Sequence, residues 1–134
     1  MKKEIIICII VVIAISIGNI ITQQYTKESV ATISNDLEEL KLDLNNKIKN
    51  EKEKTNDELS NSVDKITKDW ESRHDKLAYY IEHNELEKVE DNLTGLDSLV
   101  STEEYAEAIK ELDKCIFILR HIEEKYAFNL ENIF

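Results

Sequence analysis

The chain begins with an unbroken run of apolar residues and continues as a polar sequence in which apolar positions recur at regular intervals. Residues 5–21 contain no charged side chain. As a helix these 17 residues reach about 25 Å, close to the bilayer hydrocarbon thickness of about 30 Å. Within lipid, a helix is how a single segment satisfies its own backbone groups. The pattern therefore predicts a transmembrane helix over residues 5–21.

Apolar residues are sparse from residue 22 to residue 65, but they lie at helical intervals. Ile33, Leu37, Leu40 and Leu44 follow one another at steps of 4, 3 and 4, which is the spacing of one helix face. Polar residues, including Thr55, interrupt this face between residues 45 and 61. We expect a helical stalk over residues 22–65 that packs weakly in its middle and runs on into the following domain.

An 11-residue spacing extends the same face beyond the stalk. This period favours a nearly straight or slightly right-handed helical arrangement. The residues that share the spacing are Leu37, Ile48, Leu59, Trp70 and Ile81.

Residues 66–134 are much richer in apolar positions, which fall on three helical stripes. Asn84 with Glu87 and Ser101 with Glu104 fit the capping box that starts a helix. Short turns between three helices predict an antiparallel three-helix bundle. A core of this size usually needs further support, which the stalk, a second copy of the chain or a membrane partner would supply.

Composition agrees with an all-α protein, because the chain has no proline and two glycines and therefore few helix breakers. Its formal net charge of −11 repels phosphate backbones, so we expect no nucleic-acid partner. Cys115 is the one cysteine after the apolar run. It is expected in the core, without an intramolecular disulfide.

Positive charge at the start of the chain predicts its orientation in the membrane. Lys2 and Lys3 precede the apolar run, and positive flanks favour the cytoplasmic side. We therefore expect residues 1–4 in the cytoplasm and the remaining chain outside it, as a single-pass protein of the cell membrane. A cleavable signal with a site near Gly18 remains open, because the same pattern precedes such sites.

The sequence offers little chemistry for catalysis. It has no glycine-rich phosphate loop, paired-cysteine motif or HExxH pattern, and we expect no enzyme. His83 and His121 should lie at one end of the predicted bundle, close to Glu82. Two imidazoles and a carboxylate are candidates for a divalent metal site or a pH sensor; no other cofactor is expected.

A second group of residues is predicted to form the core or a partner contact. It combines one stripe of the first bundle helix with the large apolar residues at the end of the chain. Its members are Trp70, His74, Leu77, Ile81, Ile133 and Phe134.

Several segments of the chain resemble a known family. They are residues 74–77, 80–86 (YIEHNEL), 119–122 (LRHI) and 129–134 (NLENIF), together with Trp70. The chain is similar in these pieces to domain of unknown function 4363, a family of small single-span proteins from spore-forming Gram-positive bacteria. The resemblance implies the fold class and location, without an activity, a cofactor or catalytic residues. It also implies an accessory role, because members are often encoded near a multi-pass membrane protein.

Together these features predict a membrane-anchored, extracytoplasmic helical protein of interaction or accessory type. Residues 5–21 would contact the bilayer, and the exported bundle would bind a membrane protein or a second copy of the chain. Two alternatives remain open: a sensor of metal or pH acting through the histidine and carboxylate residues, and a secreted binding protein released by signal cleavage.

Overall fold

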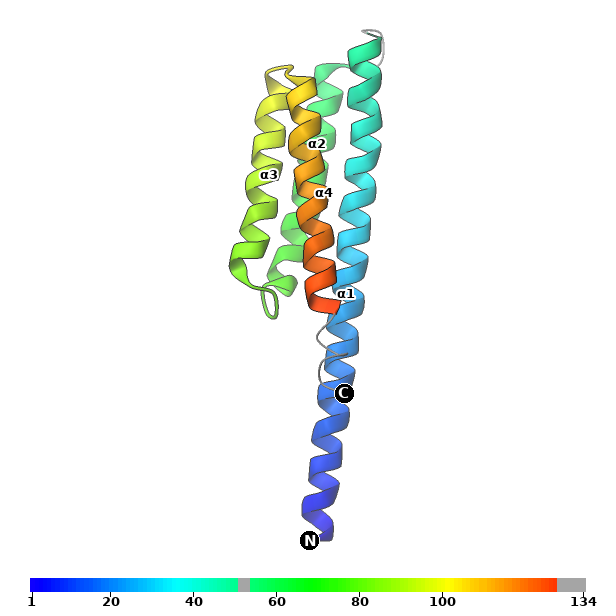
Figure 1. Ribbon diagram of the computed structural model, residues 1–134, viewed down its shortest axis with the longest axis vertical. Helices are drawn as coiled ribbons and strands as arrows, with labels where there is room; N and C mark the ends of the chain where they lie inside the picture. The colour runs from blue at the N-terminus through cyan, green and yellow to red at the C-terminus, as the bar shows by residue number, and fades with distance from the viewer. Residues whose placement is uncertain (51–53, 128–134) are drawn as a thin grey trace.

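The computed structural model describes residues 1–50 and 54–127, and these residues form four helices with no strand (Figure 1). The all-α prediction is confirmed. The helices are α1 (Lys2–Lys49), α2 (Asn56–Leu77), α3 (His83–Ser101) and α4 (Tyr105–Ala127).

The second half of α1 packs with the other three helices into an antiparallel four-helix bundle (Figure 1). Each helix contacts the next one along the chain, and α4 returns to pack against α1. The first half of α1 projects from one end of the bundle as a lone helix (Figure 1). One uninterrupted helix therefore belongs to two different environments.

Apolar stripes on all four helices meet in a single core, because each stripe faces the bundle axis. Burying a leucine side chain completely stabilises a fold by about 1.5–3 kcal/mol relative to leaving it exposed. The largest fully buried side chains are Trp70, Ile33, Leu37, Leu40, Leu44, Leu59, Leu77, Leu86, Leu93, Leu96, Leu112 and Leu119.

The region expected to form a stalk folds back on itself. Helix α1 ends at Lys49 and α2 begins at Asn56, so the helix predicted to run through residues 22–65 is two antiparallel helices. The stripe at Ile33–Leu44 thereby covers the stripe that begins at Leu59, and each removes the other from water. This is the support that a three-helix core lacked. The bundle consequently has four helices and includes most of the stalk.

Helix starts also differ from those expected. Thr55 and Glu58 form the capping box that begins α2, although we assigned no helix start there. Asn84, predicted as a cap, lies inside α3, whose N-cap is Glu82 without a side-chain cap bond. Ile48, predicted to share the core face, is half exposed because the chain turns immediately after it.

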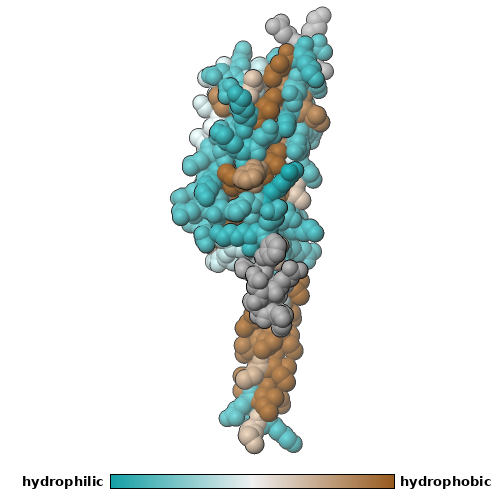
Figure 2. Space-filling model, viewed as in Figure 1, coloured by the Kyte–Doolittle hydropathy of each residue, from teal (hydrophilic) through white to brown (hydrophobic). Residues whose placement is uncertain are grey.

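The projecting half of α1 carries the apolar run. None of the most apolar window of this helix is buried inside the chain, and Figure 2 shows it as a hydrophobic stem below a largely hydrophilic bundle. Among the described residues, α1 is the one helix long and apolar enough to cross a membrane. A signal sequence satisfies the same criterion of length and composition.

Candidate functional site at the base of the bundle

Polar and titratable side chains gather at the end of the bundle from which the apolar half of α1 projects. We call this end the base. It comprises residues 20–27 of α1, the last turn of α2, the connection 78–82 between α2 and α3, the first two turns of α3 and the last two turns of α4 (Figure 1). The opposite end carries the other two connections.

Tyr80 joins the connection at the base to α1. Its Oη lies 2.9 Å from Thr26 Oγ1 and 3.1 Å from the Thr22 carbonyl oxygen, and Thr26 Oγ1 lies 2.8 Å from the same carbonyl. Two hydroxyl protons serve these three contacts, so one hydroxyl donates to the carbonyl and the other donates to its neighbour. The pKa of Tyr80 is raised above its ordinary value. Burial is the main cause, and the hydrogen bond with Thr26 partly offsets it.

Helix α4 is tied to the same connection. Tyr126 Oη accepts a hydrogen bond of 2.8 Å from the Glu82 backbone N–H. The next residue back, Lys125, lies 3.4 Å from a Glu82 carboxylate oxygen and 3.7 Å from one of Glu85. Glu85 is buried, so the nearby ammonium group compensates a charge that would otherwise be costly to desolvate.

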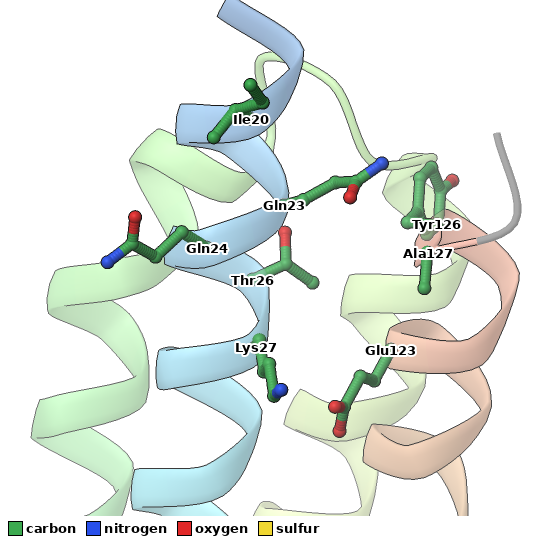
Figure 3. A pocket seen from close by; sticks show the side chains of 8 residues that line it. All are labelled: Ile20, Gln23, Gln24, Thr26, Lys27, Glu123, Tyr126 and Ala127. Carbon is green, nitrogen blue, oxygen red and sulfur yellow. The ribbon is translucent and has the colours of Figure 1, made fainter. Parts of the chain in front are cut away.

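A groove of about 410 Å³ opens between α1 and α4 at the base. Figure 3 shows Gln23, Thr26 and Lys27 on one wall and Glu123, Tyr126 and Ala127 on the other. The side chains of Lys27 and Glu123 point toward one another across it (Figure 3). The groove ends beside Ile20, within the apolar run.

We predict that His83 and His121 share one end of the bundle; the ring that contacts His83 at this end is that of His74. The two rings meet edge to face, with centroids 6.1 Å apart. His74 Nε2 lies 3.3 Å from Glu90 Oε1, and His83 Nε2 lies 2.9 Å from Glu87 Oε1. The short connection between α2 and α3 places the last turn of α2 against the first turn of α3. His74 and His83 are therefore close together.

Among the described residues, the other predicted metal candidates make no side-chain contact with this pair. His121 is exposed on α4 near the base, and Glu82 faces Lys125. Within residues 1–50 and 54–127, no group of three or more His, Cys, Asp or Glu side chains is arranged to hold a metal ion. The two histidines of the pair each contact a different glutamate, His74 with Glu90 and His83 with Glu87.

The predicted core or contact residues fall into two groups. Trp70, Leu77 and Ile81 are buried in the core, and His74 is half-buried beside them. Ile133 and Phe134 lie outside the described residues.

Sequence reasoning missed the polar contacts between α1 and α2. Ser29 is completely buried, and its hydroxyl accepts a hydrogen bond of 3.2 Å from Arg73, whose Nε also lies 3.0 Å from Asp69. With Thr22 and Thr26, Ser29 continues the spacing of the Ile33 stripe toward the apolar run. These polar residues occupy positions that face the core, and their spacing could have indicated the contact. The predicted stripe began only at Ile33.

The comparisons with known proteins agree with the resemblance seen in the sequence. A family model described as a domain of unknown function, DUF4363, matches residues 20–133. This region contains the whole described bundle and leaves most of the apolar run outside it. No curated protein and no solved structure matches the chain. Because the family model covers most of its length, the chain belongs to the DUF4363 family.

Proposed function

We propose that this protein is a single-pass membrane protein that holds an acidic helical bundle at the extracytoplasmic surface, where the bundle acts as an accessory or interaction module. The observation that carries the proposal is the division of α1. One 48-residue helix has an apolar half that this chain leaves uncovered and a second half that forms part of the bundle core.

The physical argument concerns the uncovered half. Its large apolar side chains are more than half exposed in most cases, with Ile15 at 67%. Leaving such a continuous apolar surface in water is costly, at about 25 cal/mol for each Å². A bilayer removes that cost, and the intact helix satisfies its own backbone groups there.

Continuity of α1 supports a mechanical role. No proline interrupts the chain, and α1 is helical from Lys2 to Lys49. A tilt or rotation of the membrane segment therefore moves the bundle with it. A membrane protein partner, or a second copy of this chain, would contact the module at a defined height above the bilayer.

Topology provides the direct test. Ser98→Cys places a thiol on the exposed surface of α3 and Glu4→Cys places one before the apolar run; both positions are exposed. A membrane-impermeant maleimide applied to intact cells should label Ser98→Cys and leave Glu4→Cys unlabelled until the cells are lysed. The reverse pattern would refute the proposed orientation.

The mass of the native protein tests retention of the anchor. Cleavage near Gly18 would leave the bundle intact, because the first buried residue of α1 is Thr26. The proposal therefore predicts a membrane-bound product that retains residues 5–21. A product found in the culture medium, with its N-terminus near Gly18, would establish a secreted protein instead.

The interaction role is tested separately by size. After chemical cross-linking in native membranes and mild detergent extraction, the protein should migrate above the mass of one chain. Recovery only as a monomer would contradict it. A variant with the surface change Phe117→Ser, on the exposed face of α4, checks whether that face contributes to association.

The His74–His83 pair favours a second candidate function, a response to acid pH. Histidine is the side chain whose ordinary charge change falls between about pH 5 and 8. The groups facing the pair are Asp75 on α2 and Glu87 and Glu90 on α3. A pH response carried by this pair should change when both imidazoles are removed. The dependence of the melting temperature on pH should therefore differ between the wild type and the double change His74→Gln with His83→Gln; equal behaviour would refute this candidate.

A further inference from the structure

The tyrosines of this chain are concentrated at one end of the molecule. Four of the five tyrosines lie at the base: Tyr25 on α1, Tyr79 and Tyr80 in the connection, and Tyr126 on α4. The fifth, Tyr105, lies at the opposite end, where its hydroxyl is 3.1 Å from Asn56 Oδ1. Tyrosine and tryptophan favour the boundary between lipid and water, because the ring is apolar and the hydroxyl or N–H is polar.

Contacts with α1 give the height of these residues along the apolar helix. Tyr80 Oη lies 3.1 Å from the carbonyl oxygen of Thr22, which directly follows the last residue of the apolar run. Tyr126 lines the groove that also includes Ile20 and Gln23. The connection 78–82 and the end of α4 are therefore level with the change from apolar to polar sequence in α1.

Tyr79 is the most exposed of the large apolar or aromatic side chains in the bundle, at 89%. It occupies the turn that follows α2, where its backbone N–H donates to the Lys76 carbonyl at 3.3 Å. Single exposed aromatic residues are common on soluble proteins. What distinguishes Tyr79 is its height, because a helix crossing the bilayer would place it beside the headgroups.

Lysines accompany the tyrosines at this level. Lys76 Nζ lies 5.4 Å from the centroid of the Tyr25 ring, and Lys125 Nζ lies 5.8 Å from that of Tyr126. Lys27 belongs to the groove. Carboxylates outnumber lysines at this level, where Glu82, Glu85, Glu87, Glu90, Glu123 and Glu124 lie, and Lys125 is already paired with Glu82 and Glu85. A contact with lipid here would therefore depend on the tyrosines and would not require anionic lipid.

We propose that the base of the bundle is a second membrane-contacting surface, with Tyr79 inserted into the headgroup region of the bilayer that α1 crosses. This inference rests on the proposed transmembrane anchor. The bundle is then held at two points, the α1 exit and the α2–α3 connection. Two attachments limit how far the bundle tilts relative to the bilayer, which one helix alone leaves unrestrained.

Fluorescence quenching tests the contact. The full chain is reconstituted into phosphatidylcholine vesicles that contain a lipid with a nitroxide near the headgroup. In a Trp70→Phe background, Tyr79→Trp places an indole at the base, and the matched control Phe117→Trp places one at a 72% exposed position in the middle of α4. Quenching at position 79 should exceed that at position 117 by roughly twofold or more.

Flotation of the same vesicles separates this inference from the anchor on which it rests. If the protein does not float with lipid, the proposed anchor fails. If it floats and the two positions are quenched equally, the anchor stands and the base contact is refuted. If position 79 in native membranes cross-links to a protein and is not quenched by lipid, the base is a protein-docking surface and the lipid assignment is wrong.

A second label guards against misfolding of the Trp70→Phe background. Tyr79→Cys with Cys8→Ser retains Trp70 and offers one exposed thiol, because Cys115 is buried. A spin label at position 79 should be accessible to a lipid-soluble relaxation agent more than to a water-soluble one. The opposite ratio would refute the contact.

Discussion

Tyr80 and Thr26 lie 54 residues apart in the sequence, and their hydroxyl oxygens lie 2.9 Å apart in the structure. This contact ties the α2–α3 connection to α1 one turn after the apolar run ends. It is therefore part of the link between the apolar half of α1 and the rest of the bundle.

Removing the Tyr80 hydroxyl should weaken that link. Tyr80→Phe leaves Thr26 and the Thr22 carbonyl to share one proton, and we expect a loss of about 1 kcal/mol in the free energy of unfolding. Urea unfolding of the detergent-solubilised chain, followed by Trp70 fluorescence, measures it. Tyr79→Phe is the control, because its hydroxyl lies in an exposed side chain; an equal loss in both variants would contradict the role of the contact.

Alkaline pH should act in the same place. The pKa of Tyr80 is raised by burial above the ordinary value of 10.0, so the folded state favours the protonated phenol. Its contribution is complete below about pH 10 and is lost as pH rises through the folded pKa. Unfolding midpoints measured from pH 9 upward should fall less steeply in Tyr80→Phe than in the wild type.

Trp70 allows packing and hydrogen bonding to be separated. Its side chain is 1% exposed, and in the part of the chain that the structure describes its Nε1–H meets no acceptor. Trp70→Ala should cost about 3–5 kcal/mol through the cavity that it leaves. Trp70→Phe should cost much less, because it keeps most of the ring and removes an unpaired donor. Circular dichroism during urea unfolding compares them, and equal costs would contradict this assignment.

The start of α2 depends on a reciprocal pair of hydrogen bonds. Glu58 N–H donates to Thr55 Oγ1 at 3.2 Å, and Thr55 N–H donates to Glu58 Oε2 at 2.7 Å. Thr55→Ala should cost about 1 kcal/mol in unfolding experiments. Asn84→Ala, at the position wrongly expected to cap α3, should cost under about 0.5 kcal/mol; a larger effect at Asn84 would restore the original capping assignment.

Acid should weaken the same cap. The pKa of Glu58 is lowered from 4.5 by the Thr55 backbone N–H and then by its hydroxyl. A lowered pKa means that this stabilisation is present above pH 4.5 and is lost as pH falls through the folded value. Thr55→Ala would keep the backbone N–H that is the main cause, so Glu58→Gln is the informative variant. The stability difference between the wild type and Glu58→Gln should shrink on titration from pH 6 to pH 3, and a constant difference would exclude a role for the carboxylate.

Thiol chemistry should report burial of the α4 face that holds Cys115. Burial raises the pKa of the Cys115 thiol to about 12, so almost no reactive thiolate is present at neutral pH. In a Cys8→Ser background, a maleimide should leave the native protein unmodified and label it fully in urea. Ser98→Cys, exposed on α3, should react in both conditions. Rapid labelling of native Cys115 would show that α4 does not pack as described.

The apolar and polar pattern by itself determined the fold class, because apolar residues at helical spacing predict helices however those helices later pack together. The uncharged run at residues 5–21 and the stripe from Ile33 to Leu44 could both be read from spacing alone. Family membership was also visible in short local segments such as residues 80–86. Local interactions carry all of this information.

Only the tertiary structure decided which stripes cover one another. The chain turns back after Lys49 because the apolar faces that contain Leu37 and Leu59 are then buried in one core. The spacing within either helix does not show that this burial stabilises the turn. The same fold brings His83 to His74. It also places Tyr80 against Thr22 at the edge of the apolar run. Contacts between residues distant in the sequence depend on how whole helices pack, and the spacing of residues within one helix does not predict that packing.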